Sequence, residues 1–106
     1  YFEGVESDIQ RVLMQRAGEI GPAVELNDLL SCDSFDVMSQ LSAIDLPTLV
    51  MCGDQDTMTP TKYSDYLTNN IKGAQQHVID QAQHFAQLQN YRQVNACIED
   101  FLISLK

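Results

Sequence analysis

Apolar residues in the first third of the chain recur at the spacing of one helix face. In the first expected helix, these residues are Val5, Ile9, Val12, Leu13 and Ile20. Gly18 and Gly21 are the expected breakers of that helix, and Pro22 stands where the first turn of a second helix tolerates proline. The buried stripe of the second helix would consist of Leu26, Leu29 and Leu30. The pattern therefore predicts two consecutive helices, followed by a short third one around residues 37–41.

The hydrophobic pattern changes after Pro47. Residues 48–52 form a continuous run instead of an alternating one, and Gly53 ends it. Such a run is typical of a strand in a parallel sheet, where both faces are covered. A second short strand is expected at residues 76–80. The two strands should run parallel, with a right-handed helical crossover between them.

Each expected strand is followed by a loop and a helix. The first of these helices should begin at Thr59-Pro60, with the threonine hydroxyl as its cap and the proline at the first helical position. Its apolar face would consist of Tyr63, Tyr66 and Leu67. Asn90 can cap the last helix, which carries the clearest apolar stripe of the chain: Val94, Cys97, Ile98, Phe101, Leu102 and Leu105. The second half is thus a βαβα unit of an α/β protein.

The length and the net charge of the chain limit the number of domains and exclude two kinds of partner. The 106 residues fit one domain of ordinary size. The 15 acidic and 6 basic residues give a net charge of -9, which argues against nucleic acid and against an anionic membrane surface as partners. The apolar runs are too short to span a bilayer, and no signal peptide is recognisable. Because the first residue is Tyr1 and not Met, we expect the chain to be a piece of a longer protein or to have lost an upstream segment.

The three cysteines do not form a recognisable pattern. Their number is odd, and they are widely spaced at Cys32, Cys52 and Cys97, without a Cys-x-x-Cys pair. A disulfide framework or a zinc site would show a different spacing. We therefore expect three buried residues that behave as small hydrophobic side chains in a reducing compartment. Because no signal peptide or membrane-spanning segment is recognisable either, we expect a cytoplasmic protein. No cofactor or metal ion is expected. The Asp54-x-Asp56 sequence begins like a calcium-binding loop, but Thr59 stands where the sixth position of that loop requires glycine.

Polar residues gather in the loops that follow the two expected strands. Asp54 and Asp56 follow the first strand, and His84 follows the second. Adjacent parallel strands would bring these loops together at one edge of the sheet. A carboxylate beside an imidazole is the orienting half of a nucleophilic triad. The residues alone also allow a turn-forming aspartate and a packed histidine, whereas His77 in the second strand is expected to be exposed or at an edge.

Two segments resemble the α/β-hydrolase fold family. Pro47-Thr-Leu-Val-Met-Cys-Gly-Asp-Gln-Asp-Thr-Met-Thr-Pro60 is similar to the strand and loop that carry the catalytic acid of that family. Ile79-Asp-Gln-Ala-Gln-His-Phe85 is similar to its histidine loop, and residues 91–105 resemble its C-terminal helix. The resemblance implies that Asp56 is the catalytic acid and His84 the general base. Met58 follows the acid closely enough to line a substrate pocket.

The resemblance covers the C-terminal part of the family fold only. Residues 34–106 correspond to its last βαβα portion with two parallel strands, and residues 1–33 would be the end of a helical cap or the helix that leaves it. The sequence departs from the family at Gln83, where glycine is usual, and at Gln89, where glutamate is frequent. No Gly-x-Ser-x-Gly motif for a serine nucleophile occurs in the chain.

The resemblance implies a hydrolase that cleaves an ester, lactone or related carbonyl of a small-molecule substrate. This chain would supply the acid and the histidine, and it would be inactive alone because the nucleophile is missing. Alternatives are a relative with an aspartate nucleophile for epoxides or halides, a non-catalytic binding protein of the same fold, and a self-sufficient interaction module. The unpaired edge of the strand at 48–52 predicts that the isolated chain self-associates.

Overall fold

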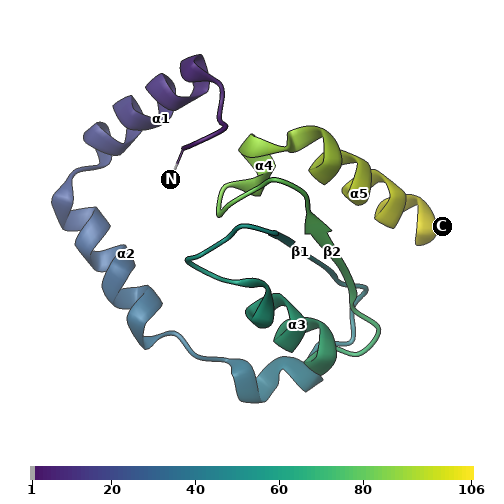
Figure 1. Cartoon of the computed structure of the whole chain (residues 1–106). Helices are drawn as coiled ribbons and strands as arrows, with labels where there is room; N and C mark the ends of the chain where they lie inside the picture. The colour runs from purple at the N-terminus through teal and green to yellow at the C-terminus, as the bar shows by residue number, and fades with distance from the viewer. Residues whose placement is uncertain (1) are drawn as a thin grey trace.

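The computed structural model describes residues 2–106 and centres on two parallel strands (Figure 1). Strand β1 (Leu49–Gly53) pairs with β2 (Gln75–Ile79) from Leu49 opposite Gln75 to Gly53 opposite Ile79. The predicted two-stranded parallel sheet is therefore confirmed. Its boundaries differ by one residue, because β1 begins and ends one position later than expected and β2 one position earlier.

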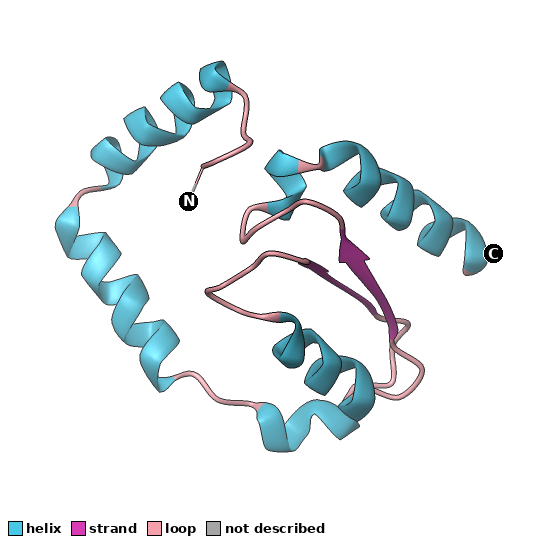
Figure 2. Ribbon diagram, viewed as in Figure 1, coloured by secondary structure: helices cyan, strands magenta, loops and turns pink. Residues whose placement is uncertain are grey.

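Helices cover both faces of this sheet (Figure 2). Helix α3 (Thr61–Asn70) connects the strands and packs against both of them. Helix α5 (Tyr91–Ser104) follows the short helix α4 (Ala86–Gln89) and packs on the opposite side. The core below α5 consists of apolar residues from the second strand, the following loop and the last helices: Ile79, Ala82, Ala86 and Val94, with Met51 and Cys97 against them.

The apolar face of α3 differs from the predicted one. Ser64 is buried, whereas Tyr63 and Tyr66 are 46% and 40% exposed. Together with the half-buried Leu67 and the buried Ile71, Ser64 forms a face at helical spacing that points to the sheet. The assignment of the two tyrosines to the buried face was wrong because they lie about 100° of helix rotation away from this face.

The first two helices form an arm beside the sheet domain (Figure 1). Neither α1 (Ser7–Ile20) nor α2 (Pro22–Ser34) contains a buried residue. The stripe predicted to be buried is exposed at all three positions: Leu26, Leu29 and Leu30. The prediction was wrong for the described chain because no other described element packs extensively on this stripe. The radius of gyration, 15.7 Å, accordingly exceeds the value of about 13 Å for a compact domain of this length.

The uncovered arm also explains the exposure of one cysteine. Cys32 lies on α2 and is exposed, whereas Cys52 on β1 is buried and Cys97 on α5 is half-buried. The expectation of three buried cysteines was therefore wrong for Cys32. All three are free thiols.

Of the two glycines expected to break the first helix, only Gly21 does so. Helix α1 continues through Gly18 and ends at Gly21, whose φ of 83° is a left-handed conformation that favours glycine. The expected break at Gly18 is absent because a single glycine is tolerated inside a helix. The third helix is a 3₁₀ helix, η1 (Met38–Ala43), and Asp36 accepts a hydrogen bond from its first backbone N–H. Within residues 2–106, no helix combines the length and apolar character needed to cross a membrane.

Candidate active site

The loops that follow β1 and β2 are joined by hydrogen bonds at the same end of the sheet. The backbone N–H of Asp54 donates to the carbonyl of Ile79 at 2.9 Å, and that of Gln55 donates to the carbonyl of Ala82 at 2.9 Å. The Asp54 carboxylate accepts from the backbone N–H of Ala82 at 3.2 Å. Asp54 is therefore a structural residue that holds the second loop against the first.

Gly53 permits this close approach of the two loops. A Cβ atom at position 53 would lie less than 3.0 Å from the backbone carbonyl oxygens of Ala82 and Gln83. Both obstacles are backbone atoms, so a side chain at this position would have to displace the loop. Among the described non-glycine residues, only Gln81 has a positive φ, 52°. The residue of this loop with a left-handed backbone conformation is therefore Gln81. Gln83, which stands where the family usually has glycine, has no positive φ.

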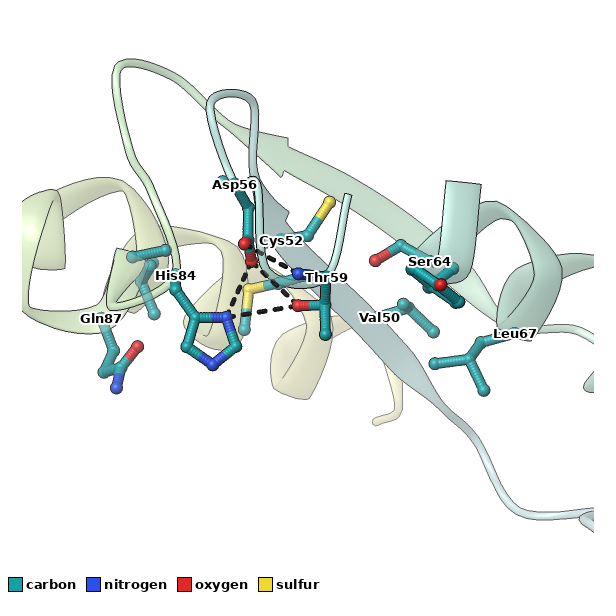
Figure 3. Close-up of a pocket in the computed structure, with 13 residues that line it drawn as sticks. Val50, Cys52, Asp56, Thr59, Ser64, Leu67, His84 and Gln87 are labelled. Atoms are coloured by element: carbon teal, nitrogen blue, oxygen red, sulfur yellow. Dashed lines mark hydrogen bonds and ion pairs between the residues drawn. The ribbon is translucent and has the colours of Figure 1, made fainter. Parts of the chain in front are cut away.

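Asp56 is buried at the centre of a hydrogen-bond network. Its Oδ1 accepts from the backbone N–H of Met58 at 2.9 Å and of Thr59 at 3.0 Å. Its Oδ2 accepts from the Thr59 hydroxyl at 2.9 Å and lies 3.0 Å from Nδ1 of His84 (Figure 3). The structure thus brings the two sequence-predicted residues, Asp56 and His84, into direct contact.

The hydrogen bonds keep Asp56 ionised. Burial by itself raises the pKa of the Asp56 carboxyl. The backbone N–H of Thr59, the His84 side chain, the Thr59 hydroxyl and the backbone N–H of Met58 act in the opposite direction and outweigh it. The pKa of Asp56 is therefore lowered from its ordinary value of 3.8, and the side chain is a carboxylate at neutral pH.

This carboxylate determines which nitrogen of His84 carries the proton. An ionised carboxylate only accepts hydrogen bonds, so Nδ1 of His84 must donate to Asp56. In the neutral imidazole, Nε2 then has a free lone pair. Figure 3 shows Nε2 on the side of the ring away from Asp56 and Thr59, and it has no hydrogen bond within the described residues. The imidazole is thus oriented to accept a proton at Nε2.

The histidine loop is supported by the N-terminal segment. The Phe85 ring is in edge contact with His84 at 5.6 Å and stacks on Phe2 at 5.3 Å. Gln89 accepts from the backbone N–H of Gln83 at 2.8 Å and donates to the carbonyl of Glu3 at 2.7 Å. A glutamate could accept the first hydrogen bond but could not donate the second. Glutamine at position 89 therefore links the histidine loop to the N-terminal segment.

A cavity of about 410 Å³ lies beside the Asp56–His84 pair. It is lined from both faces of the sheet, along the edge of β1 that does not pair with β2. Its wall includes Val50, Cys52, Ser64, Leu67, Gln87 and Val94. Met58 does not line this cavity; its side chain is exposed, and only its backbone takes part in the site.

Sequence reasoning missed the role of Thr59. It predicted a cap for α3, but that helix begins without a side-chain cap, and its N-cap residue is Pro60. The Thr59 hydroxyl instead donates to Asp56 and lies 3.3 Å from Nδ1 of His84. The expectation was wrong because α3 begins one residue later than expected, so that Pro60 occupies the N-cap position and Thr59 lies before it.

Residues 2–106 contain no group of three or more histidine, cysteine, aspartate or glutamate side chains placed to hold a metal ion. The Asp56–His84 pair offers general acid–base chemistry: an oriented imidazole with a free Nε2 beside an open cavity.

We expect the Asp56 carboxylate to stabilise the fold at neutral pH and to lose this effect in acid. Because the pKa of folded Asp56 lies below 3.8, its contribution is complete above the ordinary pKa and disappears as the pH falls through the lowered value. At about pH 7, Asp56→Asn should reduce the free energy of unfolding by about 2 kcal/mol, and by less in acid. Urea unfolding at several pH values measures this difference.

The exposed Asp28 on α2 provides the matched control for this prediction. Asp28→Asn should change the free energy of unfolding little at any of these pH values, because an exposed side chain contributes little. An Asp56→Asn penalty that stays constant from neutral to acid pH would contradict the role of the ionised carboxylate.

Known proteins similar to this chain are hydrolases. The family model for the alpha/beta hydrolase fold matches residues 5–91. Over 62 residues, the chain is 31% identical to the mouse protein named serine hydrolase BPHL, which covers 58% of this chain. Over 94 residues, it is 29% identical to a pimeloyl-[acyl-carrier protein] methyl ester esterase of Neisseria meningitidis, which covers 89% of this chain. The aligned parts are only 21% and 37% of the lengths of these two relatives.

A solved structure shows the same arrangement of elements. MGS-MChE2, an alpha/beta hydrolase enzyme from a sediment metagenome of the Mar Chica lagoon in Morocco, superposes on 95% of this chain with a TM-score of 0.73. At 17% identity, this likeness concerns the fold alone, and the matched part is 46% of that enzyme. The family match extends over most of the residues that form the sheet, the arm and the Asp56–His84 pair. The chain therefore belongs to the alpha/beta hydrolase fold family.

Proposed function

We propose that the full-length protein carrying this sequence is a serine-type hydrolase that cleaves an ester, lactone or related carbonyl of a small-molecule substrate. Asp56 would be its catalytic acid and His84 its general base. The observation that carries the proposal is the 3.0 Å contact between Asp56 and Nδ1 of His84, which leaves Nε2 free beside the cavity. The names of the two relatives, a serine hydrolase and a methyl ester esterase, support the same reaction class.

In this reaction, a serine oxygen forms a bond to the substrate carbonyl carbon while its proton moves to Nε2 of His84. The imidazolium is stabilised by the Asp56 carboxylate across the Nδ1 hydrogen bond. His84 then protonates the leaving alcohol, and the carbon–oxygen bond to that alcohol breaks. A water molecule repeats the sequence on the acyl-enzyme, with His84 again as base, and releases the acid and the serine.

We further propose that this chain supplies only one part of the catalytic centre. Residues 34–106 would be the C-terminal βαβα part of the hydrolase domain, and residues 1–33 the end of a helical cap or the helix that leaves it. The missing Gly-x-Ser-x-Gly motif, the uncovered arm and the partial coverage of the relatives support this view. The chain alone would be inactive, because a base and an acid without a nucleophile form no acyl-enzyme. The three free cysteines support a location in the cytoplasm.

The test is covalent labelling of the full-length protein with a fluorophosphonate, which reacts with an activated serine. We expect one labelled serine in the full-length protein and no labelling of the isolated residues 1–106. A folded full-length protein without any label would contradict the serine mechanism. The residue at its nucleophile position would then distinguish an aspartate nucleophile from a non-catalytic binding protein.

We also propose that the isolated chain self-associates through the free edge of β1. Backbone N–H groups alternate along a strand, and that of Asp54 points to β2. Those of Leu49, Met51 and Gly53 therefore point to the unpaired edge, which can add a strand from a second copy. Light scattering should show a mass that rises with concentration, and hydrogen exchange should show protection of these three amides. A monomeric mass across the whole series would contradict the proposal.

A further inference from the structure

The Thr59 hydroxyl closes a triangle with the two residues of the candidate acid–base pair. It donates to Oδ2 of Asp56 at 2.9 Å, and its oxygen lies 3.3 Å from Nδ1 of His84. A hydroxyl has one proton to donate and two lone pairs to accept with. The single Nδ1–H of His84 therefore has two acceptors, Oδ2 of Asp56 at 3.0 Å and the Thr59 oxygen. No other described side chain has a hydrogen bond to both members of the pair.

The Thr59 hydroxyl belongs to this triangle and does not cap helix α3. The sequence Thr59-Pro60 is typical of a helix start, and a threonine cap stabilises a helix by a hydrogen bond to its first turn. Helix α3 has no such side-chain cap. The loop therefore departs from the expected helix start by one residue: Pro60 is the N-cap, and the Thr59 hydroxyl donates its proton to Asp56 instead. Such a departure is expected where a side chain serves a site rather than its own element.

Without the Thr59 hydroxyl, the Asp56 carboxylate would lose one of its hydrogen-bond donors. Oδ1 would retain its two backbone N–H donors, those of Met58 and Thr59. Oδ2 would keep His84 as its single partner, and His84 is the more exposed member of the pair. The side chain of His84 is 35% exposed, against 4% for Asp56, so after loss of the Thr59 hydroxyl we expect water to approach the Nδ1–H bond from the histidine side.

We propose that Thr59 is a positioning residue that fixes Asp56 and His84 in one geometry and shields the hydrogen bond between them. Thr59 lines the cavity, and its hydroxyl acts through the pair, because its side-chain hydrogen bonds go to Asp56 and His84. The effect on catalysis rests on the proposed function, whereas the effect on the hydrogen bond does not. Two separate measurements can therefore test the two parts.

The first measurement is the rate of fluorophosphonate labelling of the full-length protein. Thr59→Val keeps the branched shape and removes the hydroxyl, and it should lower the rate roughly tenfold, as expected for one lost hydrogen bond to a charged group. Thr59→Ser keeps the hydroxyl and should restore the rate to within about twofold. Thr57→Val in the same loop is the control, because Thr57 is exposed and forms no hydrogen bond to the pair. It should label at the wild-type rate.

The second measurement is the nitrogen-bound proton signal of the His84 ring, observed by NMR in the full-length protein labelled with 15N-histidine. The wild-type protein and Thr59→Ser should show a slowly exchanging Nδ1–H. Thr59→Val should show the same signal broadened by exchange with water, while circular dichroism and the melting temperature show that it is folded. A Thr59→Val protein with an unchanged Nδ1–H signal and unchanged labelling would overturn the proposal.

The two measurements also separate this inference from the proposed function. Failure to label in every protein, combined with a broadened Nδ1–H signal in Thr59→Val only, would refute the serine mechanism and support the positioning role. Normal labelling in the wild type and in Thr59→Val, with no change in the signal, would support the hydrolase and refute the positioning role.

Discussion

Replacing His84 with alanine should lower the rate of fluorophosphonate labelling of the full-length protein by a factor on the order of 10⁴ or more. In the proposed mechanism, the alanine methyl group cannot accept the serine proton, and Asp56 loses the imidazole that it orients and whose cation it would stabilise. The remaining rate would come from the nucleophile and its surroundings alone. The fold should survive, since the His84 side chain is partly exposed and its removal leaves no large buried cavity.

His77→Ala is the matched control for this prediction. His77 lies on β2 and is exposed, as the sequence predicted, and the described structure shows no hydrogen bond between it and Asp56. Its replacement should leave labelling unchanged. Labelling that persists in the His84→Ala protein would remove His84 from the mechanism, and equal losses in both variants would indicate a general loss of structure.

Gly53→Ala should disrupt the site by forcing apart the two loops that carry Asp56 and His84. Its Cβ would meet the carbonyl groups of Ala82 and Gln83, which belong to the backbone of the histidine loop. The loop would have to move, and the hydrogen bond from Gln55 to Ala82 and the contact between Asp56 and His84 would be strained or lost. We expect the free energy of unfolding to fall by more than about 3 kcal/mol. Chemical denaturation and the labelling rate measure both effects.

Gly18→Ala provides the opposite case with the same chemical change. Gly18 lies inside α1, where an added Cβ meets no atom within 4 Å. Alanine favours the helix over glycine, so this variant should be unchanged or more stable by up to about 1 kcal/mol. If Gly53→Ala were as stable as Gly18→Ala, the close approach of the two loops would not be a feature of the protein in solution.

The sequence by itself determined the features that depend on neighbouring residues. The continuous apolar run after Pro47 predicts β1 to within one residue, because a strand that is covered on both faces has no polar positions. Asn90 caps α5 as predicted, since its side chain accepts from the backbone N–H of Gln93 within the same turn. The parallel pairing then places the loops of Asp56 and His84 at one end of the sheet.

Only the tertiary structure decided which partner each ambiguous side chain takes. Thr59 was expected to cap α3, but Pro60 is the N-cap of that helix, and the folded chain brings the Thr59 hydroxyl to Asp56 and His84 instead. Ser64, not Tyr63, faces the sheet, because the approach of α3 sets the rotation of the helix. The apolar stripe around Leu29 on α2 is exposed. Apolar spacing along a helix predicts a face that packs against another element, but it does not identify that element. Local patterns specify elements, whereas competition among distant partners specifies the site.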